Sequence, residues 1–204
     1  MTERITDGTA LRERYGQPSE RAVKKELDRL DRHCRHFIAR SPFLVMATAG
    51  ADGRCDASPK GDGPGFVQVV DDVTLLIPDR LGNNRVDGME NILSNPHVGL
   101  IFFLPGVRET LRINGRAEIV VEEAVLTPMA VQGKPPTAAI RVAVEEVFMH
   151  CGKALIRSRL WDPATQIERG DFPSLGQIIA DQIEGIDAAE SDAYLETVYR
   201  DRLY

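Results

Sequence analysis

The stretch VTLLIPDRLGNNRVDGMENILSNPHVGLIFFL, residues 73–104, holds the pattern that determines the fold class. It begins with a short apolar run at 73–77 and ends with another at 98–104, and both are typical of buried β-strands. Between the two runs lie turn-forming glycine and asparagine residues, followed by apolar residues at helical spacing. We therefore expect a strand, a polar loop, a short helix and a second strand, with 98–104 buried on both faces.

The segments before and after residues 73–104 also contain short runs that predict β-strands. The expected strands are 43–49, 55–60, 66–70, 73–77, 98–104, 110–120 and 137–149. Ser19 is a suitable N-cap for the first helix. The expected helices are about 19–40, 122–131, 152–161 and about 174–204. Because turns join most of the strands, the sequence predicts one domain over residues 1–204, mainly β and closed into an antiparallel barrel, with an N-terminal helix and a C-terminal helical extension.

Composition limits the partners that this chain is expected to have. Its 204 residues are 43% hydrophobic and carry a net charge of −6, which argues against a general nucleic-acid binder or a protein that clings to anionic lipid. No apolar run approaches the roughly 20 residues needed to span a bilayer, and the charged N-terminus lacks a signal core. The cysteines Cys34, Cys55 and Cys151 form no CxxC pair. We therefore expect a cytoplasmic protein without nucleic-acid or membrane partners.

Polar residues at the ends of two expected strands form the first candidate site. Lysine and arginine side chains and the N-terminus of the following helix together suit a phosphate group. Gly82 lets the backbone turn sharply and present its N–H groups. The candidate residues are Ser58, Lys60, Asp79, Arg80, Asn83, Asn84 and Arg85. On the residues alone, an ordinary exposed loop remains the alternative.

Two further clusters could meet a ligand. Thr110 and Arg112 share one face of an expected strand, where they point either to water or to a cofactor. His150, Lys153, Arg157 and Ser158 share one face of an expected helix, for which a solvated surface is the alternative.

Other patterns in the chain do not develop into sites. The glycine-rich GDGPG at 61–65 precedes a β-type run, which argues against a dinucleotide-binding fold. His33 and His36 lack a third ligand nearby, so no metal site is expected. A thiol nucleophile formed by Cys151 and His150 lacks a third residue to orient the base.

Three motifs in this order resemble those of a known family. They are SPKGDGPGF (58–66), PDRLGNNRVDGMENILSNPHVGLIFFLPGVRETLRINGRAEI (78–119) and HCGKALIRSRLW (150–161). They are similar to the pyridoxamine 5′-phosphate oxidase-like flavoproteins, the split-barrel FMN-binding superfamily, over roughly residues 35–165. The match is closest to a bacterial subgroup of FMN-dependent enzymes.

The resemblance implies a split antiparallel β-barrel that forms homodimers, with FMN in clefts at the interface. It places Ser58 near the flavin ring and assigns the phosphate and ribityl contacts to Lys60, Arg80, Asn83, Asn84 and Arg85. Thr110 and Arg112 would meet the ring edge. His150, Lys153, Arg157 and Ser158 would close the cleft, from the partner subunit.

The resemblance also implies a chemistry, with departures from true pyridoxamine phosphate oxidases. The characteristic Arg-x-x-x-x-Lys pair is here Cys55 to Lys60, and the SRK signature is replaced by GNNRVDG. The expected function is therefore an FMN-dependent oxidoreductase acting on a small molecule other than a vitamin B6 phosphate. His150 is the expected proton donor, because its pKa lies nearest neutrality. The alternatives are a non-catalytic flavin carrier or sensor, and the same fold with deazaflavin or heme.

Overall fold

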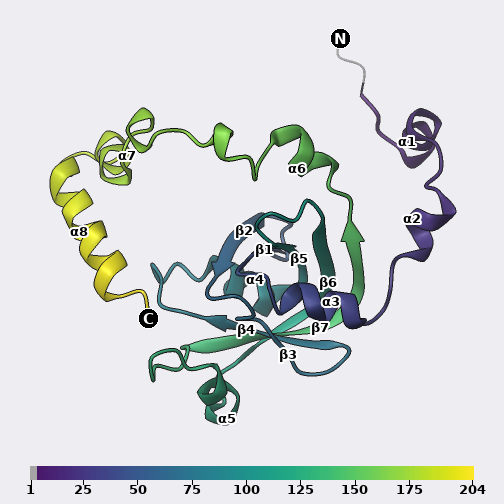
Figure 1. Ribbon diagram of the computed structural model, residues 1–204, viewed down its shortest axis with the longest axis horizontal. Coiled ribbons are helices and arrows are strands. Elements are labelled where there is room, and N and C mark those ends of the chain that lie inside the picture. Colours follow the sequence, from purple (N-terminus) through teal and green to yellow (C-terminus); the bar gives the residue numbers. More distant parts are fainter. Residues whose placement is uncertain (1–3) are drawn as a thin grey trace.

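A computed structural model describes residues 4–204 of the chain. Within this range, seven strands form one antiparallel sheet in the order β2-β1-β5-β6-β7-β4-β3 (Figure 1). The strands are β1 (Phe43–Ala49), β2 (Cys55–Gly61), β3 (Gln68–Val69), β4 (Thr74–Asp79), β5 (His97–Phe103), β6 (Thr110–Val120) and β7 (Ala138–His150). The predicted fold class, mainly β with flanking helices and a split-barrel type of sheet, is confirmed.

Alternation along the strands directs one face of the sheet into the core. The residues of this face are fully or almost fully buried: Leu44, Met46, Leu100, Phe102, Leu111, Ile113 and Val147. The sheet also curls, as ion pairs between strands far apart in its order show. Lys60 on the edge strand β2 pairs with Asp79 on β4, and just beyond these two strands Asp62 pairs with Arg80. This curvature encloses the core, as expected for a split barrel.

A β-bulge between Asn114 and Gly115 bends β6 where it pairs with β7. A Cβ atom on Gly115 would lie only 2.1 Å from the carbonyl oxygen of Ala143. Glycine is therefore required at this position for the two strands to approach each other.

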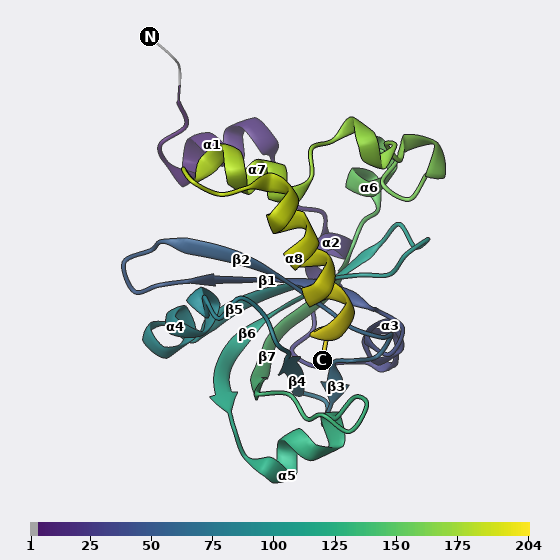
Figure 2. The ribbon, with the colours of Figure 1, turned by 90° about the vertical axis from the view of Figure 1, so that its left-hand side faces the viewer.

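Helices lie around the sheet and at both ends of the chain. They are α1 (Gly8–Tyr15), α2 (Glu20–Lys24), α3 (Arg32–Ile38), α4 (Asp87–Ser94), α5 (Glu123–Leu126), α6 (Lys153–Ser158), α7 (Leu175–Gln182) and α8 (Ala188–Asp201), with 3-10 turns at Thr127–Met129, Pro163–Thr165 and Arg169–Asp171. Figure 1 shows α1 and α2 on one side of the sheet and α7 and α8 on the other. Figure 2 shows α4 and α5 beside the sheet. None of the residues of α1, α2 or α8 is buried, so these helices form an N-terminal and a C-terminal arm outside the core.

The helix predicted over 19–40 is interrupted. Ser19 does cap α2 by accepting a hydrogen bond from the Ala22 N–H. The chain then leaves the helix, because Leu27 forms a β-bridge with Val147 through two backbone hydrogen bonds of 2.9 and 2.8 Å. An extended backbone that pairs with a strand cannot also be helical, and only the part from Leu30 onward turns its apolar residues inward.

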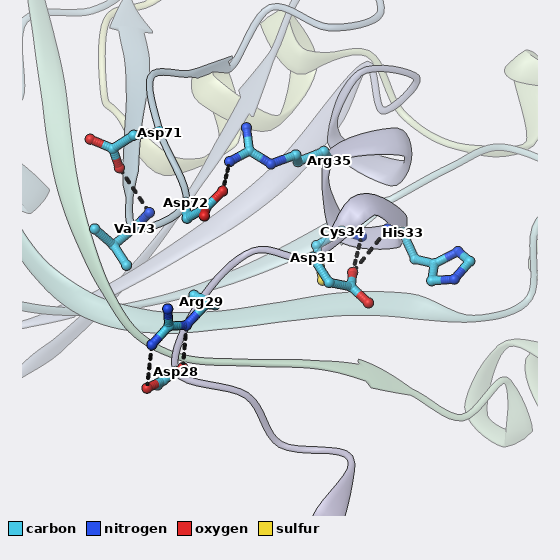
Figure 3. Close-up of polar contacts among 9 residues, drawn as sticks. All are labelled: Asp28, Arg29, Asp31, His33, Cys34, Arg35, Asp71, Asp72 and Val73. Carbon is cyan, nitrogen blue, oxygen red and sulfur yellow. Dashed lines mark hydrogen bonds and ion pairs between the residues drawn. The ribbon is translucent and has the colours of Figure 1, made fainter.

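The helix starts again at α3, which is fixed to the sheet by polar contacts. Asp31 caps α3 by accepting hydrogen bonds from the backbone N–H groups of His33 and Cys34 (Figure 3). Arg35 forms an ion pair with Asp72 in the turn between β3 and β4. Cys34 is a packed core residue, and its burial raises the pKa of the thiol to about 11.

Two other predicted segments differ from the structure, one in its burial and one in the length of its helix. The run at 98–104 is not buried on both faces in the single chain, because Ile101 and Phe103 on its outer face are only half-buried. The segment 122–131 forms the short helix α5 and a 3-10 turn, since Pro128 stands at the start of that turn.

Candidate functional site

The predicted site residues fall into two groups. The first, called the cradle below, contains Ser58, Lys60, Asp79, Arg80, Asn83, Asn84 and Arg85. The second, called the β7-end group, contains Thr110, Arg112, His150, Lys153, Arg157 and Ser158. Asp79 pairs with Ala138, the first residue of β7, whereas His150 is its last residue. A strand of 13 residues measures about 40 Å, so Asp79 and His150 lie at opposite ends of β7 in one chain.

Two of the three cations of the cradle, Lys60 and Arg80, are held by shielded carboxylates. Lys60 Nζ lies 2.7 Å from Asp79 Oδ1, and Arg80 Nε lies 2.9 Å from Asp62 Oδ2. The four side chains are at most 20% exposed, so water screens these pairs only weakly. Asp79 was predicted as a site residue, and the structure shows it as the counter-ion of Lys60. Asp62 was not predicted, because its glycine-rich loop gives no sign of pairing with Arg80.

Tyr204 closes the cradle from the far end of the chain. Its hydroxyl donates a 2.7 Å hydrogen bond to Asp62 Oδ1, and its ring centroid lies 5.6 Å from the Arg80 guanidinium carbon. Lys134 Nζ donates to a main-chain oxygen of Tyr204 at 2.9 Å. Burial alone would raise the pKa of Asp62, but hydrogen bonds from Tyr204, the Gly63 N–H and Arg80 hold that pKa below its usual value. The hydrogen bond to Asp62 in turn raises the pKa of Tyr204.

Tyr204, Arg80 and Lys134 line a hollow of about 160 Å³. The sequence gives no signal for this contact, because 142 residues separate Tyr204 from Asp62.

The loop between Arg80 and α4 has an unusual backbone. Asn84 and Val86 have φ angles of 59° and 48°, and a β-branched residue such as Val86 rarely adopts a positive φ. Val86 is the N-cap of α4 and offers no side-chain acceptor to it. Strain of this kind is characteristic of ligand-binding segments.

Side chains in this loop have separate roles. Asn83 Oδ1 accepts a hydrogen bond from the Arg85 N–H and thereby shapes the turn, whereas exposed Arg85 pairs with Asp87 at 2.8 Å. Ser58 Oγ lies 3.6 Å from the position that a Cβ on Gly88 would occupy. The structure therefore places Ser58 beside the first turn of α4.

The β7-end group surrounds an aromatic ring. Thr110 pairs with His150 and Arg112 pairs with Phe148 across β6 and β7. The Arg112 guanidinium carbon lies 5.0 Å from the Phe148 ring centroid, and the His150 ring lies 6.3 Å from it. Burial is the largest cause that lowers the pKa of His150, and the charges of Arg112 and Lys25 lower this pKa further. His150 is therefore mainly neutral at pH 7.

Helix α6 adds Lys153, Arg157 and Ser158, all exposed in the single chain. The Trp161 indole N–H fixes the segment after α6 by donating to the Val107 carbonyl oxygen at 2.8 Å. Among the described residues, no ion pair involves Lys153 or Arg157. Their predicted contact with a cofactor stays a prediction.

A larger hollow of about 370 Å³ lies elsewhere on the sheet. Its lining includes Ala47, His97, Asn114 and Glu145, none of which belongs to the predicted site. Over residues 4–204, no three His, Cys, Asp or Glu side chains gather closely enough to hold a metal ion. No helix in the same range has the length and apolar character needed to cross a membrane.

Comparison with known proteins gives one family match. The family model of pyridoxamine 5′-phosphate oxidase matches residues 30–151, more than half of the chain. This range contains the cradle and ends just after His150, and it excludes Lys25, α6 and Tyr204. The comparison with curated proteins found no match.

Several solved structures are similar at low identity. HupZ from Group A Streptococcus is 22% identical, with 59% of this chain and 93% of that chain covered and a TM-score of 0.49. An F420 reductase is 18% identical, with 57% and 94% covered and a TM-score of 0.42. General Stress Protein 26 from Bacillus anthracis is 13% identical, with 56% and 88% covered and a TM-score of 0.42.

Proposed function

Because the chain belongs to the pyridoxamine 5′-phosphate oxidase-like family, we propose that it binds FMN and acts as an FMN-dependent oxidoreductase on a small molecule. The observation that supports this most directly is the start of α4. The helix begins at a strained residue without a side-chain cap, beside Ser58. Its free N–H groups and its positive dipole end suit a phosphate group.

The charges of the cradle fit the FMN phosphate. Lys60 and Arg80 are each paired with one carboxylate, that of Asp79 and that of Asp62, in a shielded position. The ion pairs to Asp79 and Asp62 use only part of the donors of Lys60 and Arg80, which have three and five N–H groups. The carboxylates hold the two cations in place, and the remaining donors are free to bind phosphate oxygens.

We further propose that two copies of the chain share each flavin. Asp79 of the cradle and His150 lie at opposite ends of β7, which favours a flavin that lies between two chains. The outer face of the sheet suits such an interface. Pro59, Val45, Ile101, Arg112 and Phe148 follow one another in register across five strands of that face.

The apolar residues on this face are incompletely covered. Phe43 is 38% exposed, and its ring lies 6.1 Å from that of Phe103. A partner copy would bury the second side of β5 and account for its apolar sequence.

Bound FMN would supply hydride or electron transfer, and the residues of the chain would hold and tune it. Lys60 and Arg80 would fix the phosphate end. In this proposal His150, neutral near pH 7, exchanges a proton with the substrate through its imidazole ring.

Spectroscopy and turnover assays together test the proposal. Purified protein should show or take up the absorption spectrum of FMN, and FMN-loaded protein should oxidise NADH or NADPH or reduce an added acceptor. Flavin uptake without turnover would favour the non-catalytic carrier or sensor. A heme or deazaflavin spectrum would favour those cofactors, and protein that takes up no FMN would contradict the proposal.

A further inference from the structure

Three cationic or ionisable side chains gather around Phe148. Arg112 comes from β6, His150 from the end of β7, and Lys25 from the residue after α2. Lys25 Nζ lies 5.1 Å from the Phe148 ring centroid, a distance close to the 5.0 Å of Arg112. A further hydrogen bond of 2.8 Å, from Lys25 Nζ to the Met149 carbonyl oxygen, fixes the lysine on β7.

From this arrangement, we propose that Lys25, Arg112 and His150 form a binding site for the carboxylate or phosphate group of a small organic anion. The assignment of this site to the substrate of the enzyme rests on the proposed flavin function. The binding of an anion at this site is independent of that function. Lys25 lies outside the residues that match the family.

The charge balance supports the proposal. In the described part of the chain, none of the ion pairs involves Lys25, Arg112 or His150. This differs from the cradle, where each cation has a carboxylate. The nearby Glu146 instead accepts a 2.8 Å hydrogen bond from Asn114.

The behaviour of His150 points the same way. Besides burial, the charges of Arg112 and Lys25 lower its pKa, and no carboxylate raises it. An uncompensated cationic group in a chain of net charge −6 suits an anionic ligand.

The contacts leave donors free for such a ligand. Lys25 uses one of its three N–H groups on Met149, and Arg112 keeps its five-donor guanidinium, which is suited to paired contacts with carboxylate or phosphate oxygens. An anion placed among these groups would stabilise the protonated form of His150, and the resulting shift reports binding.

NMR titration of His150 tests the proposal on the full chain loaded with FMN, in a phosphate-free buffer at constant ionic strength. The probes are benzoate, its neutral analogue benzamide, and inorganic phosphate. We expect saturating benzoate or phosphate to raise the His150 midpoint by about one pH unit and benzamide to leave it unchanged. If benzoate shifts His150 at a lower concentration than phosphate does, the ligand group is a carboxylate. The reverse order identifies a phosphate group. His33, His36 and His97 serve as internal controls.

Two variants test the residues involved. Lys25→Met and Arg112→Gln should each remove most of the anion-induced shift. Because Lys25 lies on an exposed arm, Lys25→Met keeps the test valid if Arg112→Gln does not fold. The proposal is wrong if neither anion shifts His150, if benzamide shifts it equally, or if all four histidines shift together.

The same titration without FMN separates this proposal from the flavin function. Benzoate should still shift His150 in protein that has lost FMN or never binds it. If FMN, but not riboflavin, raises the His150 midpoint and displaces benzoate, the site belongs to the cofactor phosphate and the substrate assignment is wrong.

Discussion

At the residue scale, Lys60 and Arg80 are cations with little access to water. A shielded cation needs an anion beside it, and Asp79 and Asp62 fill that role. The sequence predicted the two cations and Asp79 as neighbours of a ligand, because they stand at the ends of strands. It could not predict Asp62, Lys134 or Tyr204, whose contacts depend on how the sheet curls and where the C-terminal arm returns.

The proposed phosphate contacts give the first prediction. Lys60→Ala and Arg80→Ala should each weaken FMN binding roughly tenfold to a hundredfold, because a hydrogen bond to a charged group contributes about 1.5–3 kcal/mol. Riboflavin, which lacks the phosphate, should lose much less affinity. Fluorescence titration with both ligands measures the two effects.

Arg54→Ala is a matched control for these variants, because Arg54 is 90% exposed and pairs with Asp52 away from the cradle. It should bind both ligands as the unmodified protein does. An equal loss of FMN and riboflavin affinity in Lys60→Ala and Arg80→Ala would refute the phosphate assignment.

His150 gives a prediction about pH. Its folded-state pKa is lowered, so the unfolded chain binds this proton more readily and folding stability should fall as pH decreases from about 7 through the folded-state pKa. His150→Gln should remove the part of this decrease in folding stability that comes from protonation of His150. Urea unfolding at pH 8, 7, 6 and 5 measures it as a free-energy difference between variant and unmodified protein. A difference that stays constant over this range would contradict the lowered pKa.

At the element scale, strands were easier to predict than helices. The alternating residues of β6 and β7 gave nearly the correct bounds, because the period of a strand follows directly from burial on one face. The helix over 19–40 was predicted too long, since Val23 and Leu27 continue its apolar spacing although Leu27 pairs with β7. Local spacing cannot reveal a partner 120 residues away.

The C-terminal arm gives the third prediction. Tyr204→Phe removes the hydrogen bond to Asp62, which should increase opening of the segment after α8 by about fivefold, equivalent to about 1 kcal/mol. Tyr204→Ala also removes the ring beside Arg80 and should increase opening further. Amide hydrogen exchange of residues 201–204 measures this opening.

Tyr194→Ala is the control for the arm, because Tyr194 is 62% exposed on α8. It should leave the exchange of these residues unchanged. If Tyr204→Ala also leaves it unchanged, the contact between Tyr204 and the cradle does not hold the arm in solution.

At the scale of the whole molecule, one chain leaves the proposed site divided. Asp79 of the cradle lies at one end of β7 and His150 at the other. A half-covered apolar face extends across the strands between β2 and β7. The sequence predicted the apolar character of β5 but not which side stays open, because both faces of the strand are apolar. A second copy of the chain would complete the proposed flavin site and would bury the half-covered apolar face.

This arrangement predicts a dimer of about twice the 22.6 kDa chain mass. Ile101→Glu places a charge in the middle of the outer face and should yield monomers that bind FMN more weakly. Val70→Glu, at a site that is 57% exposed beyond β3, should remain dimeric. Analytical ultracentrifugation distinguishes the species. A dimer that persists in Ile101→Glu would place the interface elsewhere.

The central claim, that this fold binds FMN through a phosphate cradle, is tested most directly by equilibrium titration of the unmodified protein with FMN and with riboflavin. The account predicts uptake of one FMN per chain, with FMN bound at least about tenfold more tightly than riboflavin, since the phosphate should contribute at least about 1.5 kcal/mol. Equal affinity for the two ligands, or no uptake of either, would contradict it.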